Sequence, residues 1–203
     1  TNQIIKRIFD IVCTVCGGLF FLPVLLWIFI WVKMDSGGPA IYKQKRVGKD
    51  GKEFYCYKFR SMVVDSKERL EKLLTTDSKA REEWERDFKL KNDPRITRSG
   101  AFLRKTSLDE LPQLLNVLKG EMSLVGPRPI VQDEVPKYEQ YIKEYFMVLP
   151  GITGLWQVSG RSDTTYPQRV AMDMWYVHNW SVWLDVVLLW RTFYAVINGR
   201  GAY

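Results

Sequence analysis

The chain has 203 residues, enough for one domain with a hydrophobic core and a few appended elements. Its 30 Lys and Arg against 23 Asp and Glu give a formal net charge of +7, which indicates an anionic partner such as phosphate, nucleic acid or acidic lipid. The three cysteines are an odd number, so a disulfide framework is not expected and a reducing compartment fits. Eight Trp favour a membrane interface, where aromatic side chains with a polar edge concentrate.

Residues 11–32 form an uncharged apolar run, IVCTVCGGLFFLPVLLWIFIWV. At about 1.5 Å per residue, a helix of this length is long enough to span the core of a bilayer. Pro23 lies in the middle of the run, where it removes a backbone hydrogen bond and kinks a helix. Basic residues flank both ends, and the positive-inside rule places such flanks on the cytoplasmic side. We therefore expect either a re-entrant membrane helix over residues 1–36, bent at Pro23, or a kinked transmembrane span; a buried core helix is the third interpretation.

Segment 40–62 has the pattern of two strands around a Gly/Asp turn, which predicts a small β-hairpin. Phe54, Cys56, Lys58 and Arg60 share one face of the second strand, because strand side chains alternate between faces. The two cations on this face can bind a phosphate. They can equally protect a solvated hairpin edge from aggregation.

Two further segments have helical spacing of their apolar residues. Residues 65–91 are densely charged and predict two short amphipathic helices. Residues 172–197 are rich in Trp and are typical of helices that lie at a membrane surface, with a buried C-terminal helix as the alternative. Together these elements predict a mostly helical α+β fold.

The stretch SLDELPQLLN at 107–116 places two carboxylates, Asp109 and Glu110, beside each other shortly before a proline. Ser107 and Glu110 have the spacing of a capping box, but this cap puts Pro112 where its missing N–H is needed. With Asp109 as the cap, Pro112 falls in the first turn, where proline is tolerated. In both cases the two carboxylates lie at a helix N-terminus, which favours negative charge.

The acidic pair has a structural and a chemical interpretation, and the residues alone leave both open. A helix start with two acidic residues is common. An ionised carboxylate can also attack phosphorus and form an aspartyl phosphate, while its neighbour helps to hold Mg²⁺. Basic residues elsewhere in the sequence supply the positive charge that this chemistry needs: Lys58, Arg60, Arg104 and Arg128.

Two turn regions are candidates for ligand binding. In GPRP, at 126–129, the prolines restrict the backbone around Arg128, so its guanidinium can bind phosphate as a preorganised fork; a plain proline turn is the alternative. The glycine-rich stretch LPGITGLWQVSGR, at 149–161, carries Gln157 and Arg161 and could frame a substrate pocket.

Five blocks, in this order, resemble the bacterial sugar transferases, which are monotopic phosphoglycosyl transferases acting on polyprenol phosphate. They are KRIFD (6–10), YKFRSM (57–62), RKTSLDELPQLLNVLKGEMSLVGPRP (104–129), PGITGLWQVSGR (150–161) and DMWYVHNWSVWLD (173–185). The chain is most similar to the catalytic part of undecaprenyl-phosphate galactose or glucose phosphotransferases. The resemblance implies transfer of hexose 1-phosphate from a UDP-hexose to undecaprenyl phosphate, with release of UMP, through a covalent aspartyl sugar-phosphate.

The resemblance also implies roles for individual residues. Asp109 corresponds to the nucleophile, and Glu110 to the residue that helps to bind Mg²⁺ beside it. Arg104 and Arg128 match basic positions associated with the donor phosphates, and Lys58 and Arg60 are weaker correspondences. Asp185 is expected to pair with the N-terminal basic cluster, with Arg7 as the candidate partner.

The architecture that the resemblance implies has two parts. Residues 1–36 form the re-entrant membrane helix, and residues 37–203 form a catalytic domain with interfacial amphipathic helices on the cytoplasmic face of the bacterial inner membrane. The chain is expected to be the C-terminal part of a longer membrane protein, and a homodimer is compatible with the family. The reaction would be the first membrane step of O-antigen, capsule or exopolysaccharide synthesis.

Two other functions remain as alternatives. A basic membrane-surface binding protein without catalysis also explains the charge and the aromatic residues. A nucleic-acid binder explains the charge, but the long apolar run and the absence of a recognisable nucleic-acid motif argue against it, so no nucleic-acid partner is expected.

Overall fold

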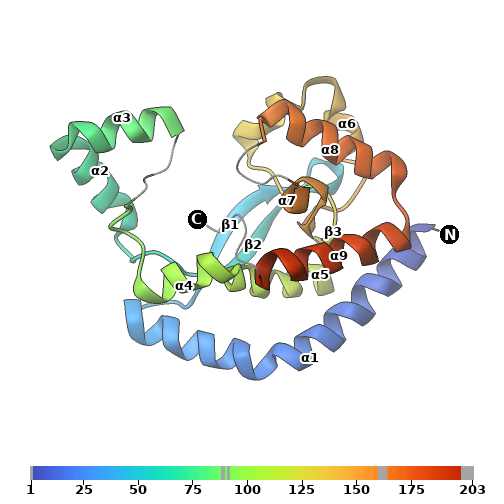
Figure 1. Cartoon of the computed structure of the whole chain (residues 1–203), viewed down its shortest axis with the longest axis horizontal. Coiled ribbons are helices and arrows are strands. Elements are labelled where there is room, and N and C mark those ends of the chain that lie inside the picture. Colours follow the sequence, from blue (N-terminus) through green and yellow to red (C-terminus); the bar gives the residue numbers. More distant parts are fainter. Residues whose placement is uncertain (1, 88–89, 91, 160–163, 198–203) are drawn as a thin grey trace.

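A computed structural model describes residues 2–87, 90, 92–159 and 164–197 of the chain (Figure 1). The helices are α1 (Asn2–Ser36), α2 (Ser66–Thr76), α3 (Ser78–Asp87), α4 (Arg98–Thr106), α5 (Leu114–Lys119), α6 (Ile142–Tyr145), α7 (Leu155–Ser159), α8 (Tyr166–Asn179) and α9 (Val182–Ile197). The strands are β1 (Ile41–Val47), β2 (Glu53–Phe59), β3 (Ser123–Val125) and β4 (Gly151–Thr153), and the 3₁₀ segments are η1 (Lys49–Gly51), η2 (Leu108–Gln113) and η3 (Gln132–Tyr141). This composition confirms the predicted α+β class, mostly helical.

The predicted hairpin is formed by β1 and β2, which pair antiparallel with Gln44 opposite Cys56. Cys56 is buried in the core, and β2 packs against η2, the segment that carries the acidic pair. The charged segment after the hairpin forms α2 and α3, as predicted, and Figure 1 shows these two helices extending away from the rest of the domain.

A second, parallel pair of strands holds the two turn regions together. Ser123 lies opposite Gly151, and the amide of Gly126 donates to the carbonyl of Thr153. A Cβ on Gly151 would lie 2.1 Å from the backbone nitrogen of Gly126, so the close approach of these two turns requires glycine. The GPRP turn and the glycine-rich turn are therefore fixed side by side.

Helix α1 contains Pro23 and bends near its middle, so that its two arms run along the same side of the domain (Figure 1). The N-terminal arm contacts α5 and β3, and the C-terminal arm contacts α4. Residues 3–36 are long and apolar enough to cross a membrane, and only 11% of the most apolar window is buried. The buried core helix of the third interpretation is therefore wrong.

A buried polar network attaches the N-terminal arm to α8 and α9. Lys6 Nζ lies 2.6 Å from Asp185 Oδ2 and 3.4 Å from Asp10 Oδ1, and both carboxylates have no exposed surface. Tyr176 and Trp180 also donate hydrogen bonds to Asp185, at 2.7 and 3.1 Å. Each of these buried carboxylates thus has an opposite charge or a hydrogen bond, and Lys6 itself is largely buried.

The predicted pairing of Asp185 with the N-terminal basic cluster is confirmed, but the partner is Lys6 and not the candidate Arg7. Lys6 lies one helical turn before Asp10, on the face of α1 that meets α9. Arg7 points to α5, where its guanidinium donates to the carbonyls of Val117 and Leu118 at 2.5 and 2.9 Å. Arg7 therefore also attaches α1 to the domain. It does so at the C-terminal end of α5, where a positive charge is favoured.

The C-terminal arm is attached in a different way. Asp35 accepts hydrogen bonds from the backbone amide and hydroxyl of Ser99, in the first turn of α4, at 2.9 and 2.7 Å. Ile28 and Val32 pack against Leu103 of α4, and all three side chains are fully buried. Both ends of α1 are consequently held by the same domain.

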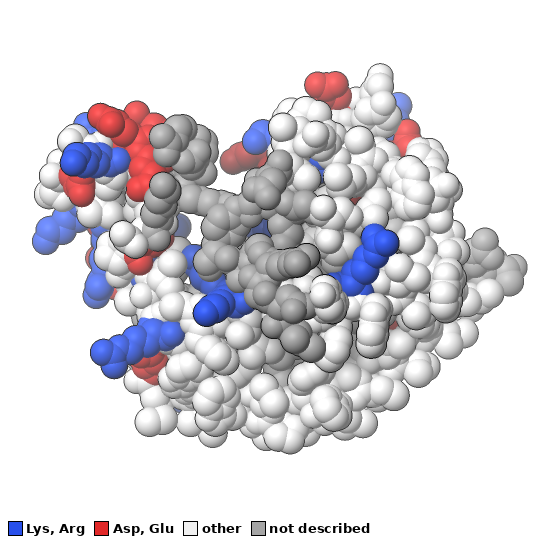
Figure 2. Space-filling view, in the orientation of Figure 1, with Lys and Arg blue, Asp and Glu red and all other residues white. Residues whose placement is uncertain are grey.

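The outer faces of α1 and α9 form an apolar surface. Figure 2 shows few charged side chains over this part of the molecule. Its large exposed side chains include Ile4, Ile8, Leu19, Phe20, Trp27, Ile30 and Met34 of α1, and Trp183, Trp190, Phe193 and Tyr194 of α9. Helix α9 of the Trp-rich C-terminal segment therefore exposes aromatic residues, as expected for a helix at a membrane surface.

Replacing Lys6 should destabilise the domain strongly. In Lys6→Met, two buried carboxylates lose their cation, and we expect the free energy of unfolding to fall by about 3 kcal/mol. The loss is measured by thermal or chemical unfolding in detergent micelles. Lys45→Met is the control, because Lys45 and its partner Glu53 are more than half exposed and such pairs contribute less than about 1 kcal/mol. Equal losses in the two variants would contradict the anchoring role of Lys6.

Candidate active site

The acidic pair lies in the first turn of η2, directly after α4. Ser107 joins the two elements in the left-handed conformation, with φ of 57°, and its side chain makes no capping hydrogen bond. The predicted capping box is therefore wrong, and Asp109 is not the cap either. The chain passes through a 3₁₀ segment, and the α-helix starts only at Leu114. Pro112 lies inside this 3₁₀ segment.

Glu110 is paired with a lysine from the hairpin. Lys58 Nζ donates to Glu110 Oε1 at 2.6 Å, which places Lys58 at the acidic pair as the sequence predicts. Burial alone would raise the pKa of Glu110, but the positive charges of Lys58, Arg128 and Arg46 outweigh it and hold this pKa below its usual value. Glu110 is therefore an ionised and oriented carboxylate at neutral pH.

Asp109 has a different environment, although it is the adjacent residue. Burial and the negative charge of Glu110 raise the pKa of Asp109 to about 6, against the opposing charges of Lys58 and Arg104. At pH 7 the carboxylate form still exceeds the acid roughly tenfold. Asp109 is thus a mostly ionised but poorly solvated carboxylate, which is the state that favours nucleophilic attack.

The pair fits a magnesium ion that arrives with a phosphate ligand. Among the residues that the structure describes, no group of three or more His, Cys, Asp or Glu side chains could hold a metal ion by itself. Mg²⁺ does not require such a group, because it is usually bound by one or two carboxylates together with substrate phosphates and water. Asp109 and Glu110 supply two carboxylates whose negative charges repel each other, and a divalent cation would relieve this repulsion.

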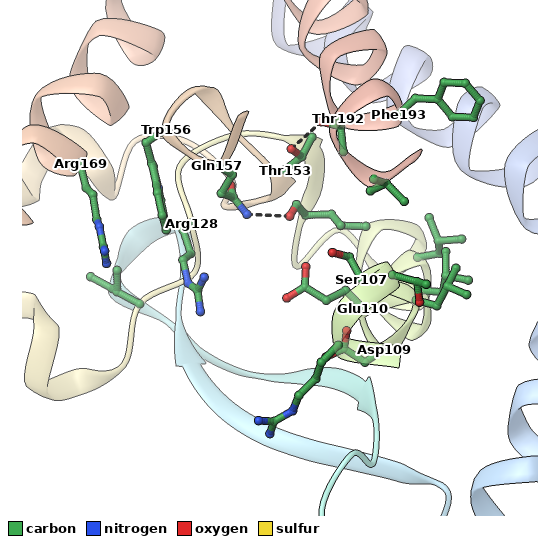
Figure 3. A pocket seen from close by; sticks show the side chains of 18 of the residues that line it. Ser107, Asp109, Glu110, Arg128, Thr153, Trp156, Gln157, Arg169, Thr192 and Phe193 are labelled. Atoms are coloured by element: carbon green, nitrogen blue, oxygen red, sulfur yellow. Dashed lines mark hydrogen bonds between the residues drawn. The ribbon is translucent and has the colours of Figure 1, made fainter. Parts of the chain in front are cut away.

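Both carboxylates line a cavity of about 650 Å³, a volume typical of small-molecule sites. Figure 3 shows Arg169, Trp156, Arg128, Glu110 and Asp109 following one another along it. The other end is apolar and is formed by α1, η2 and α9, through Phe21, Leu108, Leu111, Phe193 and Val196. The cavity therefore joins a polar, aromatic end to an apolar end at the exposed face of α1 and α9.

Other predicted binding residues are found at or beside this cavity. Arg104 lines it, and its Nε donates to Ser61 Oγ at 2.9 Å. Gln157 lines it and donates to the carbonyl of Ile152 at 3.0 Å. Lys58 borders a smaller adjoining pocket that Glu110, Arg128 and Gln157 also line.

Arg128 also lines the cavity, and the protein fixes its backbone from two sides. The hydroxyl of Tyr145 donates to the carbonyl of Arg128 at 3.1 Å. Arg46, from β1, donates to the carbonyl of the next residue, Pro129, at 3.0 Å. The GPRP turn is thus held against the hairpin, which supports the predicted preorganisation of the guanidinium.

Two predicted binding residues are not found in the cavity. Arg60 lies just beyond the end of β2, where its guanidinium donates to the carbonyl of Pro39, and it does not line either pocket. It therefore stabilises the connection between α1 and β1 in this structure. Arg161 lies outside the described residues.

Arg169 and the tyrosines around it were not among the predicted binding residues. Arg169 and Tyr166 lie three residues apart on one face of α8, and both line the cavity together with Tyr138 of η3. No local pattern distinguishes Arg169 from the other arginines of this basic chain. Only the packing of α8 against η3 and α7 brings it to the site.

Tyr138 is positioned by a buried carboxylate. Its hydroxyl donates to Asp173 Oδ2 at 2.7 Å, and Asp173 has only 1% of its surface exposed. Burial raises the pKa of Asp173 to about 7, although the hydrogen bond from Tyr138 and the charge of Arg128 act in the opposite direction. A carboxyl group that titrates near neutral pH thus lies buried behind Tyr138, which lines the cavity.

Comparison with known proteins agrees with this site. The family model described as "Bacterial sugar transferase" matches residues 1–199. The chain belongs to this family.

Relatives of known name match the whole chain. An undecaprenyl-phosphate galactose phosphotransferase of Salmonella typhimurium is 57% identical over 204 residues, which cover 100% of this chain and 42% of the relative. A UDP-glucose:undecaprenyl-phosphate glucose-1-phosphate transferase of Escherichia coli is 40% identical over 210 residues, which cover 100% of this chain and 42% of the relative. The exopolysaccharide production protein ExoY of Rhizobium meliloti is 48% identical over 198 residues, which cover 98% of this chain and 88% of the relative. The chain thus spans less than half of the first two relatives and most of the third.

The titration of Asp173 should make stability depend on pH. The folded protein keeps this proton up to a pKa of about 7, whereas the unfolded chain loses it near pH 4. Stability therefore falls as the pH rises between these values, by at most about 1.4 kcal/mol per pH unit. Asp173→Asn should show a smaller drop in melting temperature between pH 5 and pH 8 than the wild-type protein.

The exposed carboxyl of Asp133 provides the control for this measurement. Asp133→Asn should keep the wild-type pH dependence. An unchanged slope in Asp173→Asn would show that this carboxyl is ionised in the folded protein across the whole range.

Proposed function

We propose that this chain is the catalytic part of a phosphoglycosyl transferase that moves galactose 1-phosphate or glucose 1-phosphate from a UDP-sugar to undecaprenyl phosphate and releases UMP. The observation that carries the proposal is the position of Asp109. It is a largely ionised carboxylate in a cavity that also contains Glu110, Arg104 and Arg128 and that opens to the apolar face of α1 and α9. The names of the Salmonella typhimurium and Escherichia coli relatives support the same donor and acceptor classes.

The first step transfers the sugar phosphate to the protein. An oxygen of the Asp109 carboxylate attacks the phosphorus that bears the sugar, and a new O–P bond forms. The bond between this phosphorus and the bridging oxygen breaks, and its electron pair leaves with the phosphate of UMP. The raised pKa of Asp109 makes its carboxylate a better nucleophile than a fully solvated one, while a large ionised fraction remains at neutral pH.

The second step transfers the sugar phosphate to the lipid. A phosphate oxygen of the acceptor attacks the same phosphorus, and the bond to Asp109 breaks and restores the carboxylate. Arg128 and Arg104 line the cavity beside this carboxylate and can bind the charged phosphoryl oxygens in both steps. Lys58 acts indirectly, because it orients Glu110 and keeps it ionised.

Magnesium is the cofactor that this site would use. Asp109 and Glu110 would hold the ion together with the phosphates of the donor, and the ion would neutralise charge on the transferring group. The ion pair with Lys58 keeps Glu110 oriented before any ligand binds.

The apolar surface supports a location at the membrane. Both arms of α1 attach to one domain, so a helix that enters the bilayer with its bend around Pro23 can leave by the same face. The arrangement favours the re-entrant helix over a transmembrane span. The basic residues that flank the apolar run support the cytoplasmic face of the bacterial inner membrane for the domain. The lipid phosphate would then reach Asp109 from the apolar end of the cavity, and the nucleotide from the other end. The homodimer stays a prediction.

The first half of the reaction can be tested without the acceptor. Purified protein freed of lipid and incubated with Mg²⁺ and a UDP-sugar labelled in the sugar should take up about one label per chain and release an equal amount of UMP. Asp109→Asn should take up none, because an amide cannot form the acyl phosphate. Asp133→Asn, which changes an exposed carboxylate, should be labelled like the wild-type protein.

Two results would count against the proposal. Labelling that persists in Asp109→Asn would place the nucleophile elsewhere. Release of UMP only when undecaprenyl phosphate is present, without a labelled protein, would indicate direct transfer from donor to acceptor.

A further inference from the structure

Trp156 lies between two guanidinium groups in the wall of the cavity (Figure 3). The guanidinium carbon of Arg128 is 5.7 Å from the centre of the Trp156 ring, and that of Arg169 is 4.8 Å from it. A cation over an aromatic ring is attracted to it, so the indole holds both arginines in place although they come from different elements. Arg128 follows β3, and Arg169 lies on α8.

Neither guanidinium is neutralised by the protein. Among the described residues, no carboxylate lies within 4 Å of the side-chain nitrogens of Arg128 or Arg169, and both side chains line the cavity. The two glutamates at the cavity are already paired, Glu134 with Arg46 at 3.7 Å and Glu110 with Lys58 at 2.6 Å. Two unpaired cations at a cavity wall constitute a site for an anion with more than one negative group.

The spacing of the two arginines fits a diphosphate. Their guanidinium carbons can be no farther apart than the two ring distances added together, a span that two phosphates joined by one oxygen can bridge along the edge of the indole. The order along the cavity also has a direction. Asp109 and Glu110 begin this row of side chains, Arg128 follows them, and Arg169 lies beyond Trp156 (Figure 3).

We propose that Arg169 is a second phosphate-binding residue, which binds the phosphate of the UMP leaving group while Arg128 binds the phosphoryl group that Asp109 attacks. This inference rests on the proposed function, since it assumes a nucleoside diphosphate sugar as donor. Trp156 is the positioning residue that holds the two guanidiniums at a fixed spacing.

The reaction gives Arg169 a catalytic task as well as a binding task. When the bond between phosphorus and the bridging oxygen breaks, its electron pair moves onto the phosphate of UMP, whose negative charge increases by one. A cation at this phosphate interacts more strongly with the transition state than with the bound donor, and so it accelerates the step. Arg128 does not take this place, because it lies on the side of Trp156 that faces Asp109 and Glu110 (Figure 3).

The assignment is tested by comparing UMP with UDP as ligands, by calorimetry on the purified protein with Mg²⁺. Arg169→Met should raise the dissociation constants of UMP and UDP by about tenfold each, because both ligands carry the phosphate next to the ribose. Arg128→Met should raise the constant of UDP about tenfold but that of UMP less than threefold. Arg169→Lys should give an intermediate loss, because lysine keeps the charge but not the planar fork.

Lys137 supplies the matched control. Its ammonium lies 5.0 Å from the centre of the Tyr166 ring, on the same side of the molecule, but it does not line the cavity. Lys137→Met should bind UMP and UDP within twofold of the wild-type protein. This control separates a specific contact from the general loss of one positive charge.

Three outcomes would overturn the assignment. Unchanged UMP binding in Arg169→Met would remove Arg169 from the phosphate site, and equal losses in Lys137→Met would reduce its effect to net charge. A larger loss of UMP binding in Arg128→Met than in Arg169→Met would reverse the two roles. A wild-type protein that binds neither ligand would instead contradict the proposed function, so the two failures are distinguishable.

Discussion

The buried ion pair between Lys6 and Asp185 determines where the rest of the molecule can lie relative to a membrane. It fixes the first arm of α1 against α9, and Asp35 fixes the second arm against α4. An apolar helix whose two ends are attached to one domain cannot leave that domain on opposite sides. The bend at Pro23 resolves this constraint, and it brings Phe21 to the apolar end of the cavity. In the proposed reaction, this position would let a lipid phosphate and a soluble nucleotide both reach Asp109.

Within the cavity, two adjacent carboxylates acquire different properties from their surroundings. Glu110 receives the lysine of the hairpin and stays fully ionised, whereas Asp109 is buried beside that negative charge and has its pKa raised to about 6. Environments that separate the pKa values of neighbouring acids are how proteins give them separate roles. The cations divide in a similar way, because Lys58 and Arg46 are engaged with glutamates while Arg128 and Arg169 line the cavity without a carboxylate partner among the described residues.

Much of this arrangement could be predicted from local sequence patterns. The apolar run with Pro23, the hairpin, the charged helices and the acidic pair are all encoded by residue type and spacing within a few turns of chain. One error is local, because Ser107 does not form the predicted cap, and the other errors concern residues whose partners are far away in the sequence. Lys6 rather than Arg7 meets Asp185, and Arg60 binds a backbone carbonyl, because the rotation of α1 and the turn after it decide which side chain reaches which neighbour. Arg169 could not be identified at all, since its contact with Trp156 exists only after α8 has packed.

The claim that α1 returns to the side from which it enters can be tested most directly by labelling cysteines in the membrane-embedded protein. In a cysteine-free background, Gln3→Cys and Lys33→Cys place exposed thiols at the two ends of α1, and Lys45→Cys marks the catalytic domain. A maleimide that cannot cross membranes should modify all three from the same side, in inverted vesicles but not in intact cells. Modification of Gln3→Cys and Lys33→Cys from opposite sides would show a transmembrane span and contradict this account.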